Sequence, residues 1–247
     1  MRNKGLKLSL ALIAMLTILV ACATYGGEAT PTLPPSPTAL PPTPASPTET
    51  LIPPPRFFTE EFDADALHWE IFLTNGDQTL FGHKIEEGHW SFMLGGKYMY
   101  VYAIYQPETY REVRIDARAA NQGQNKNFTS LICDFSLKEG WYEFNASNDG
   151  RYYLLHGIWD ASLNRPRYTV LVDGGSNLIK YNNGVNEYGL VCKGRMLTLF
   201  INGEEIRIIE EKEFALRSGQ VGIGVSSFDV LPIQVDFDSV TVSEPPQ

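Results

Sequence analysis

Aromatic and charged side chains alternate along three stretches of the sequence in a pattern suited to sugar binding. They are Tyr98, Tyr100 and Tyr102, then Arg114 and Asp116, then Trp141 and Glu143. Aromatic rings cover the apolar C–H faces of sugars, while planar polar groups hydrogen-bond to vicinal hydroxyls. If the three stretches are neighbouring strands, these side chains form one outward-facing patch. The sequence therefore predicts a carbohydrate-binding site.

The same residues allow other interpretations. Tyrosine favours strands in general, and Arg and Glu often form cross-strand pairs on a sheet surface. Asp116, Glu143 and Glu112 could supply the two carboxylates that glycoside cleavage needs, but their separation is not encoded locally. A non-catalytic binding module is therefore favoured, with a saccharide hydrolase as the alternative. A structural or adhesive module that binds a protein partner is the third interpretation.

Metal and cofactor chemistry has less support. The four histidines lie on separate predicted strands and lack the spacing of metal ligands. A structural Ca²⁺ site is one interpretation if the terminal strands pair, because acidic residues lie near both ends of the folded region: Glu61, Asp63, Asp236 and Asp238. Acidic strand edges without a metal are the simpler explanation, and no cofactor is predicted.

Two hairpin turns within residues 187–208 set the predicted faces of three strands. Lys193-Gly194 and Asn202-Gly203 are two-residue turn signals, which place Cys192 opposite Arg195 and Ile201 opposite Glu204. One face is then apolar and should belong to the core: Tyr188, Leu190, Cys192, Leu197, Leu199, Ile201, Ile206 and Ile208.

The rest of the folded region follows the same alternation. Residues 97–105 place Met99, Val101 and Ala103 on a core face and the three tyrosines opposite them. About fourteen short strands with regular turn signals are expected, and no ten-residue stretch has helical periodicity. The predicted fold class is all-β: a two-sheet antiparallel β-sandwich or jelly roll.

Four segments resemble parts of concanavalin A-like (laminin G-like) sandwich domains. They are Glu61-Phe62-Asp63 with Trp69, residues 197–203, residues 219–224 and residues 235–240. The nearest likeness is to the group named after 3-keto-disaccharide hydrolases. The resemblance implies twisted antiparallel sheets, often with a carbohydrate site on the concave face. The Glu-x-Asp-x-x-Glu pattern of related sandwich glucanases is absent, so no catalytic residue is carried over.

Two cysteines of the folded region form a candidate disulfide. In residues 129–135 the alternation puts Cys133 on the face of Leu131 and Phe135, and Cys192 lies on the apolar face of the hairpins. Two buried cysteines favour a disulfide if the protein is exported, as its first residues indicate below, although two separate core thiols would also pack well.

The first residues have the features of an export signal. A basic start with Arg2, Lys4 and Lys7 precedes an uncharged run over residues 8–20, which is short for a membrane-spanning helix. Leu19-Val20-Ala21-Cys22 resembles the lipobox of bacterial lipoproteins. The resemblance implies cleavage before Cys22 and lipidation of that residue. An ordinary secretory signal or an uncleaved anchor is the alternative.

Three regions follow from composition. We expect a signal peptide over residues 1–21, a Pro- and Thr-rich disordered tether over 22–55, and the β-sandwich domain over 56–247. The chain carries a net charge of −9, and no basic patch indicates nucleic acid as a partner. The expected location is extracytoplasmic, with the protein held at the membrane or cell surface by its lipid.

Overall fold

The computed structural model describes residues 54–247, which form two antiparallel β-sheets and one short 3-10 helix, η1 (Gln78–Leu80). The strands are β1 (Phe58–Glu60), β2 (Trp69–Asn75), β3 (Phe81–Glu86), β4 (His89–Leu94), β5 (Tyr100–Tyr105), β6 (Glu112–Asn121), β7 (Asn127–Ser136), β8 (Gly140–Ser147), β9 (Arg151–Asp160), β10 (Arg165–Gly175), β11 (Val185–Lys193), β12 (Met196–Ile201), β13 (Glu204–Glu210), β14 (Gln220–Ser227) and β15 (Ile233–Ser243). No helix in this part of the chain is long and apolar enough to cross a membrane.

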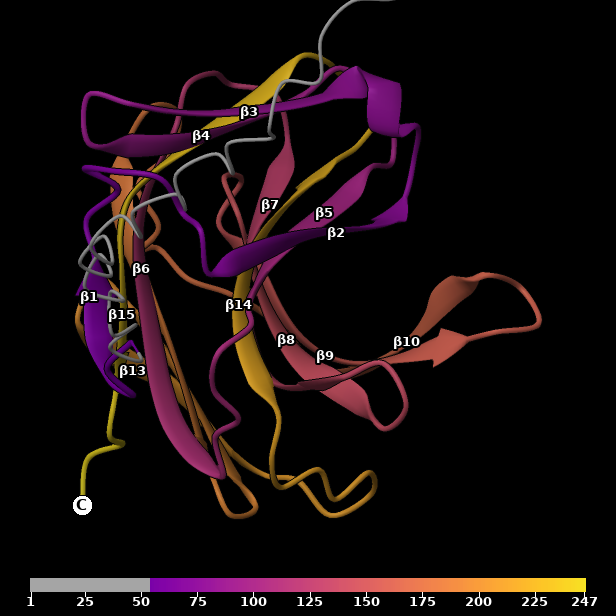
Figure 1. The fold of residues 1–247 in the computed structure, drawn as a ribbon, viewed down its shortest axis with the longest axis vertical. Helices are drawn as coiled ribbons and strands as arrows, with labels where there is room; N and C mark the ends of the chain where they lie inside the picture. The colour runs from indigo at the N-terminus through magenta and orange to yellow at the C-terminus, as the bar shows by residue number, and fades with distance from the viewer. Residues whose placement is uncertain (1–53) are drawn as a thin grey trace, which may run out of the picture. The chain divides into compact units, whose positions relative to one another are not determined.

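The two sheets pack face to face as a sandwich (Figure 1). The eight-stranded sheet has the order β13-β12-β11-β6-β15-β4-β3, with β1 paired to β15 beside this path. The seven-stranded sheet has the order β10-β9-β8-β7-β14-β5-β2. The predicted two-sheet antiparallel fold is confirmed.

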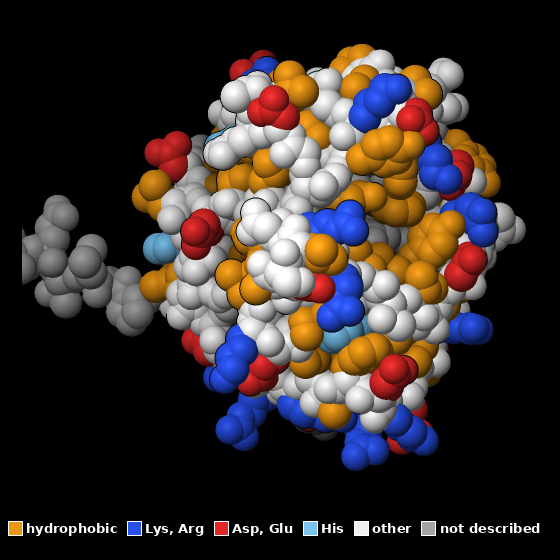
Figure 2. Space-filling view, turned by 90° about the vertical axis from the view of Figure 1, so that its right-hand side faces the viewer, with side chains coloured by type: hydrophobic (Ala, Val, Ile, Leu, Met, Phe, Trp, Pro, Cys, Tyr) orange, Lys and Arg blue, Asp and Glu red, His pale blue; other side chains and the backbone are white. Residues whose placement is uncertain are grey.

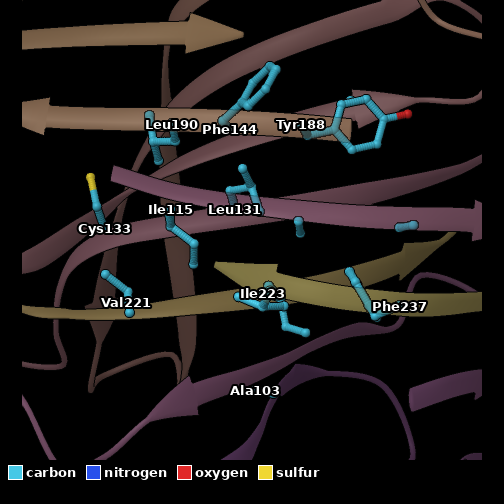
Figure 3. Close-up of a cluster of buried hydrophobic side chains, with 14 of the residues drawn as sticks. Ala103, Ile115, Leu131, Cys133, Phe144, Tyr188, Leu190, Val221, Ile223 and Phe237 are labelled. Atoms are coloured by element: carbon cyan, nitrogen blue, oxygen red, sulfur yellow. The ribbon is translucent and has the colours of Figure 1, made fainter. Parts of the chain in front are cut away.

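The main core lies between the sheets and takes one face from each of them. Figure 3 shows Ile115, Tyr188 and Leu190 from one sheet meeting Leu131, Phe144 and Ile223 from the other. The alternation predicted for residues 97–105 is confirmed on this side, because Met99, Val101 and Ala103 are all fully buried.

The hairpins over residues 187–208 are present, with two corrections to the predicted register. Cys192 lies opposite Leu197 rather than Arg195, because the first turn consists of Gly194 and Arg195 between paired Lys193 and Met196. A shift of two residues preserves the face, so Leu197 still points inward.

The second turn and strand β13 show the other correction. Ile201 pairs with Glu204 as predicted, and Asn202 and Gly203 have the positive φ values of this turn. The pairing then shifts between Leu199 and Phe200, which inserts one extra residue into β13. Ile208 is consequently 52% exposed, not buried as predicted, and Ile209 packs against the core instead.

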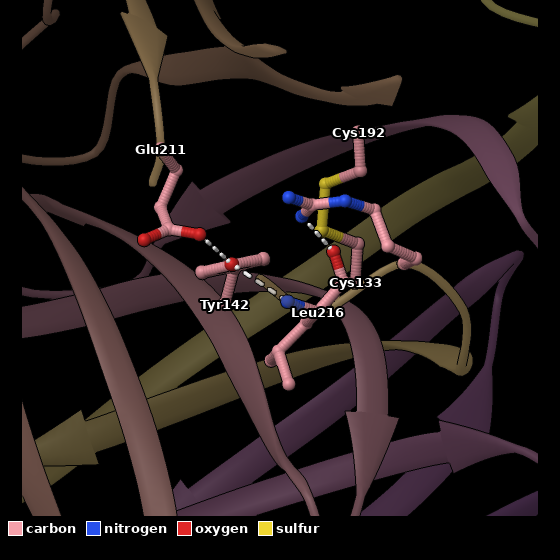
Figure 4. Close-up of a disulfide and its surroundings, with 6 residues drawn as sticks. Cys133, Tyr142, Cys192, Glu211 and Leu216 are labelled. Carbon is pink, nitrogen blue, oxygen red and sulfur yellow. Dashed lines mark hydrogen bonds between the residues drawn. A yellow bond between two sulfur atoms is a disulfide. The ribbon is translucent and has the colours of Figure 1, made fainter. Parts of the chain in front are cut away.

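Cys133 of β7 and Cys192 of β11 form the predicted disulfide, which joins the two sheets (Figure 4). Beside it, Glu211 accepts a hydrogen bond from the Tyr142 hydroxyl and three more from the backbone N–H groups of residues 213–215. The Tyr142 hydroxyl oxygen accepts a hydrogen bond from the backbone N–H of Leu216. These contacts fix the loop between β13 and β14 over the disulfide.

Candidate functional site

The outer face of the seven-stranded sheet is concave. In Figure 1, β8, β9 and β10 sweep outward below β2 and β5, so that the two ends of the sheet approach each other. Figure 2 looks onto this side and shows hydrophobic side chains gathered around a hollow. We call this surface the concave face.

A buried carboxylate lies at the centre of the concave face. Glu143 of β8 is 2% exposed and accepts hydrogen bonds from the Tyr102 hydroxyl at 3.0 Å and from the Trp141 indole N–H at 3.0 Å. The Tyr102 hydroxyl also lies 2.9 Å from the Tyr168 hydroxyl of β10. Three strands thus place aromatic rings around a single carboxylate.

Two glycines make room for these rings. A Cβ atom on Gly224 of β14 would lie 2.4 Å from the Tyr102 ring, and one on Gly157 of β9 would lie 2.4 Å from the Trp141 ring. Real Cβ atoms do not approach other atoms so closely. Tyr102 and Trp141 therefore lie directly against the backbone of neighbouring strands, which only glycine allows here.

Burial dominates the electrostatics of this centre. It raises the pKa of Glu143, although hydrogen bonds from Trp141, Asn145, Tyr102 and Ser130 oppose the shift. Burial, together with the Glu143 charge, also raises the pKa of Tyr102 well above its ordinary value. Glu143 and Tyr102 therefore keep their protons to a higher pH than an exposed glutamate and an exposed tyrosine would.

Aromatic contacts close the middle of the concave face. Phe72 of β2 and Trp159 of β9 have ring centroids 5.7 Å apart, although four strands separate β2 from β9 in the sheet. The centroid of the Tyr168 ring lies 6.0 Å from that of Trp141 and 6.4 Å from that of Tyr100. Glu143 is therefore covered by rings, and a ligand has to bind beside this cluster unless the rings move.

An open groove of about 480 Å³ lies at one end of the cluster. We call it the end groove; its lining is Glu70, Phe72, Ile104, Gln106, Thr109, Phe135, Ser136, Leu137, Glu139, Ser218, Gly219 and Gln220. Phe72 and Phe135 pack edge to face at 5.7 Å, and the Gln220 side-chain amide donates to the Gln106 side-chain oxygen at 3.2 Å. The groove thus combines aromatic rings with amide, hydroxyl and carboxylate groups.

The single patch predicted from sequence does not form. Arg114 and Asp116 belong to β6 in the eight-stranded sheet, where they form a bidentate ion pair at 2.7 and 2.8 Å. The Arg114 guanidinium also lies 4.5 Å from the centre of the Phe200 ring. The prediction required β6 to neighbour β5 and β8, but those strands lie in the other sheet.

The remaining predicted residues divide between the surface and the buried centre. Tyr98 precedes β5, is 44% exposed and donates a hydrogen bond to Asp229 at 2.7 Å. Tyr100, Tyr102, Trp141 and Glu143 do converge on the concave face. Tyr102 and Trp141 are nevertheless buried, so in this conformation they support the surface rather than form it.

The carboxylates proposed for catalysis are not assembled. Asp116 and the exposed Glu112 lie on β6, away from Glu143. Along β8 the residues that alternate on the face of Glu143 are Asn145 and Ser147, which are neutral. Acid and base catalysis by the predicted carboxylates therefore has no geometric support.

The terminal strands do pair, since Phe58 of β1 lies opposite Val242 of β15. Even so, no three acidic, histidine or cysteine side chains within residues 54–247 are grouped closely enough to hold a metal ion. Asp238 instead contacts Arg118 at 2.9 Å and His89 at 3.2 Å. The calcium hypothesis gains no geometric support from Glu61, Asp63, Asp236 and Asp238.

The residues of the end groove were not found by sequence reasoning. For Phe72 the sequence does contain a usable pattern, because this residue alternates with core residues on a predicted strand and so belongs to the face opposite the core. Phe135 was assigned to the core face with Cys133, but the chain bulges between Cys133 and Ser136, and Asp134 has a positive φ of 52°. The bulge turns Phe135 to the concave face.

Comparison with known proteins supports the fold. No protein-family model and no curated protein sequence matches the chain. Similar solved structures include a Bacteroides ovatus glycoside hydrolase family 16 enzyme from a mixed-linkage glucan locus, with a TM-score of 0.55 and 8% identity over 75% of this chain and 99% of that chain. The domain has the concanavalin A-like jelly-roll fold.

Two further similar structures are an enzyme domain and a binding module. The laminarinase catalytic domain of Thermotoga petrophila has a TM-score of 0.51 and 9% identity, covering 76% of this chain and 97% of its own. The carbohydrate-binding module CBM66 of Bacillus subtilis has a TM-score of 0.51 and 10% identity, covering 70% of this chain and 95% of its own. The same fold thus occurs in enzymes and in a binding module.

Proposed function

We propose that this protein is a carbohydrate-binding module that takes saccharides in the end groove of the concave face. The observation that carries the proposal is the lining of the groove: the partly buried Phe72 ring, backed by the nearly buried Phe135 ring, beside the Gln106 and Gln220 amides. Sugars offer apolar C–H faces to such rings and hydroxyl groups to such amides.

The neighbours named as glucanases and as a carbohydrate-binding module support a saccharide ligand. Binding without catalysis is favoured because the carboxylate at the centre of the face, Glu143, is covered and has neutral residues beside it on β8. Glu143 then acts as a positioning residue that holds Tyr102 and Trp141 in place.

The test is calorimetric titration of the protein with a panel of soluble oligosaccharides, neutral, amino-substituted and acidic. We expect at least one member to bind, and Phe72→Ala to weaken it by about tenfold, since one aromatic contact is worth on the order of 1 kcal/mol. Gln106→Ala should weaken the same ligand.

Phe200→Ala is the matched control, because Phe200 is a half-buried ring on the outer face of the other sheet. It should leave affinity unchanged. A folded protein that binds no saccharide, or equal losses in Phe72→Ala and Phe200→Ala, would refute the proposal.

Saccharide hydrolysis is the second candidate, and one observation favours it. Glu70 and Glu139 line the same groove, and glycoside cleavage uses a pair of carboxylates. The substrate class would be oligosaccharides or disaccharides, including 3-keto-disaccharides. Release of reducing sugar that disappears in both Glu70→Gln and Glu139→Gln would establish this candidate, whereas binding without release leaves the module as proposed.

The proposal also includes the location of the protein in the cell. Residues 1–53, which include Cys22 and the Pro- and Thr-rich segment, lie outside the described part of the chain. The lipobox-like Leu19-Val20-Ala21-Cys22 supports a lipid anchor that presents the domain at the cell surface. Incorporation of a labelled lipid precursor into the protein, lost in Cys22→Ala, would test the anchor.

A further inference from the structure

We propose that the end groove binds the end of a glycan chain rather than its middle, and that the sugar it takes carries no negative charge. This inference rests on the proposed function and specifies its ligand. It follows from two features of the groove: its inner wall and its charge.

The inner wall is a continuous aromatic barrier. Phe72 and Phe135 contact each other at 5.7 Å and both line the groove. Behind them, the ring centroids of Phe72 and Trp159 are 5.7 Å apart, and those of Phe135 and Trp141 are 5.4 Å apart. A chain that enters the groove from solvent therefore meets packed rings.

The barrier also covers the route along the rest of the face. Beyond it lies the closed cluster in which Trp141, Glu143 and Tyr102 are at most 2% exposed. A polysaccharide crossing the face would have to displace the Phe72–Trp159 contact and then uncover Glu143. A terminal unit needs neither change, because the outer part of the groove is formed by exposed residues such as Gln106 and Leu137.

The charge of the groove restricts the terminal sugar. Glu70 and Glu139 are exposed carboxylates in the lining, and neither forms an ion pair with another residue in the range 54–247. The described lining contains no Lys or Arg. Two unneutralised carboxylates repel a uronate or sulfate and tolerate a neutral or amino sugar.

The experiment extends the panel with a length series of the neutral oligosaccharide that binds, from about two to about eight units, in calorimetry. End binding predicts one protein per chain and an affinity that stops rising after about three units. Several proteins per chain, or an affinity that rises through six or more units, would overturn the inference while leaving the proposed function intact.

Trp159→Ala tests the barrier itself. Removing this ring opens the route past Phe72, so affinity should now increase with chain length. Phe228→Ala, a ring at the Phe128 end of the same face, is the control and should keep the wild-type length profile. An unchanged profile in Trp159→Ala would show that the Phe72–Trp159 contact does not limit the ligand.

The charge is tested with the same ligand carrying a terminal uronate. We expect binding at least tenfold weaker than for the neutral form, and a recovery of about tenfold in the Glu70→Gln/Glu139→Gln double variant. Equal affinity for the neutral and uronate forms would refute the charge selection. Absence of binding to every saccharide would instead refute the proposed function, and this inference with it.

Discussion

Trp141 was predicted to contact sugar, but its position makes it a structural residue. The side chain is fully buried and lies against Gly157, while its indole N–H donates to Glu143. Truncation of a buried aromatic residue costs about 3–5 kcal/mol. We therefore expect Trp141→Ala to lower Tm by on the order of 10 °C, measured by circular dichroism.

Gly157→Ala examines the same contact from the other side. The new methyl group would lie 2.4 Å from the indole ring, so the ring has to shift and stability should again fall. Gly82→Ala is the control, because Gly82 also lies in a strand and its new methyl group would meet only the end of the Met93 side chain at 3.5 Å, an ordinary contact. If Gly157→Ala is no more destabilising than that control, the close packing of Trp141 on β9 is refuted.

Asp134 is a second buried acid, and its behaviour with pH can be predicted. Burial raises the pKa of Asp134 to about 7, which the nearby Arg217 only partly opposes. The unfolded carboxyl has a pKa of about 4. Between these values the folded protein holds more protons than the unfolded chain, so stability decreases as pH rises from about 4 to about 7.

Asp134→Asn should flatten this dependence and stabilise the protein above pH 7. Asparagine tolerates the positive φ of 52° at this position, so the backbone need not change. The free energy of unfolding of each protein, measured with urea at about pH 5 and at about pH 8, gives the two pH dependences. Parallel pH profiles for the two proteins would show that Asp134 ionises in the folded state as it does in the unfolded chain.

At the scale of elements, the disulfide joins β7 to β11 and therefore one sheet to the other. The two cysteines are 59 residues apart, and closing a loop of that length stabilises the folded state by about 4 kcal/mol in the chain-entropy model. We expect the Cys133→Ala/Cys192→Ala variant to fold but to unfold at a lower urea concentration. The same midpoint with and without the disulfide would contradict this role.

Sequence alternation predicted the inward faces well where strands are regular. Met99, Val101 and Ala103 are buried because side chains of a regular strand alternate strictly. The alternation failed at bulges, where one extra residue exposed Ile208 and turned Phe135 outward. A bulge depends on the pairing of two strands, which the local sequence of neither strand reveals.

Local sequence patterns also do not reveal which of the two sheets a strand joins. Arg114 and Tyr102 lie on strands that follow each other along the chain, yet β5 and β6 belong to different sheets. Strand order in a jelly roll is set by long-range pairing, such as β6 with β11 and β15. The sequence therefore identified Tyr100, Tyr102 and Trp141 of the concave face and combined them with residues from the opposite side of the domain.

At the scale of the whole molecule, the seven-stranded sheet curls until residues of β2 and β9 touch. This curl creates a second, smaller core on the concave face around Tyr102, Ile104, Ile132, Phe135 and Trp141. The first core holds the sheets together, and the second closes the centre of the concave face. The end groove lies against the edge of this second core, and Ile104 and Phe135 belong to both.

The charge of the whole chain bears on how it would be held at a membrane. The sequence has a net charge of −9, and removal of residues 1–21 with their three basic side chains would make it more negative. An acidic protein is repelled by anionic lipid, so attachment would have to come from acyl chains on Cys22, each buried CH₂ contributing about 0.8 kcal/mol.

We therefore expect Cys22→Ala to move the protein from the membrane fraction to the soluble fraction, at low and at high salt alike. Salt independence is the informative part, because an electrostatic contribution to membrane binding would weaken as salt screens it. Quantitative blotting of both fractions, with Cys133→Ala/Cys192→Ala as a cysteine control that keeps Cys22, measures the distribution. Retention of Cys22→Ala in the membrane fraction would show that something other than lipid on this cysteine holds the protein there.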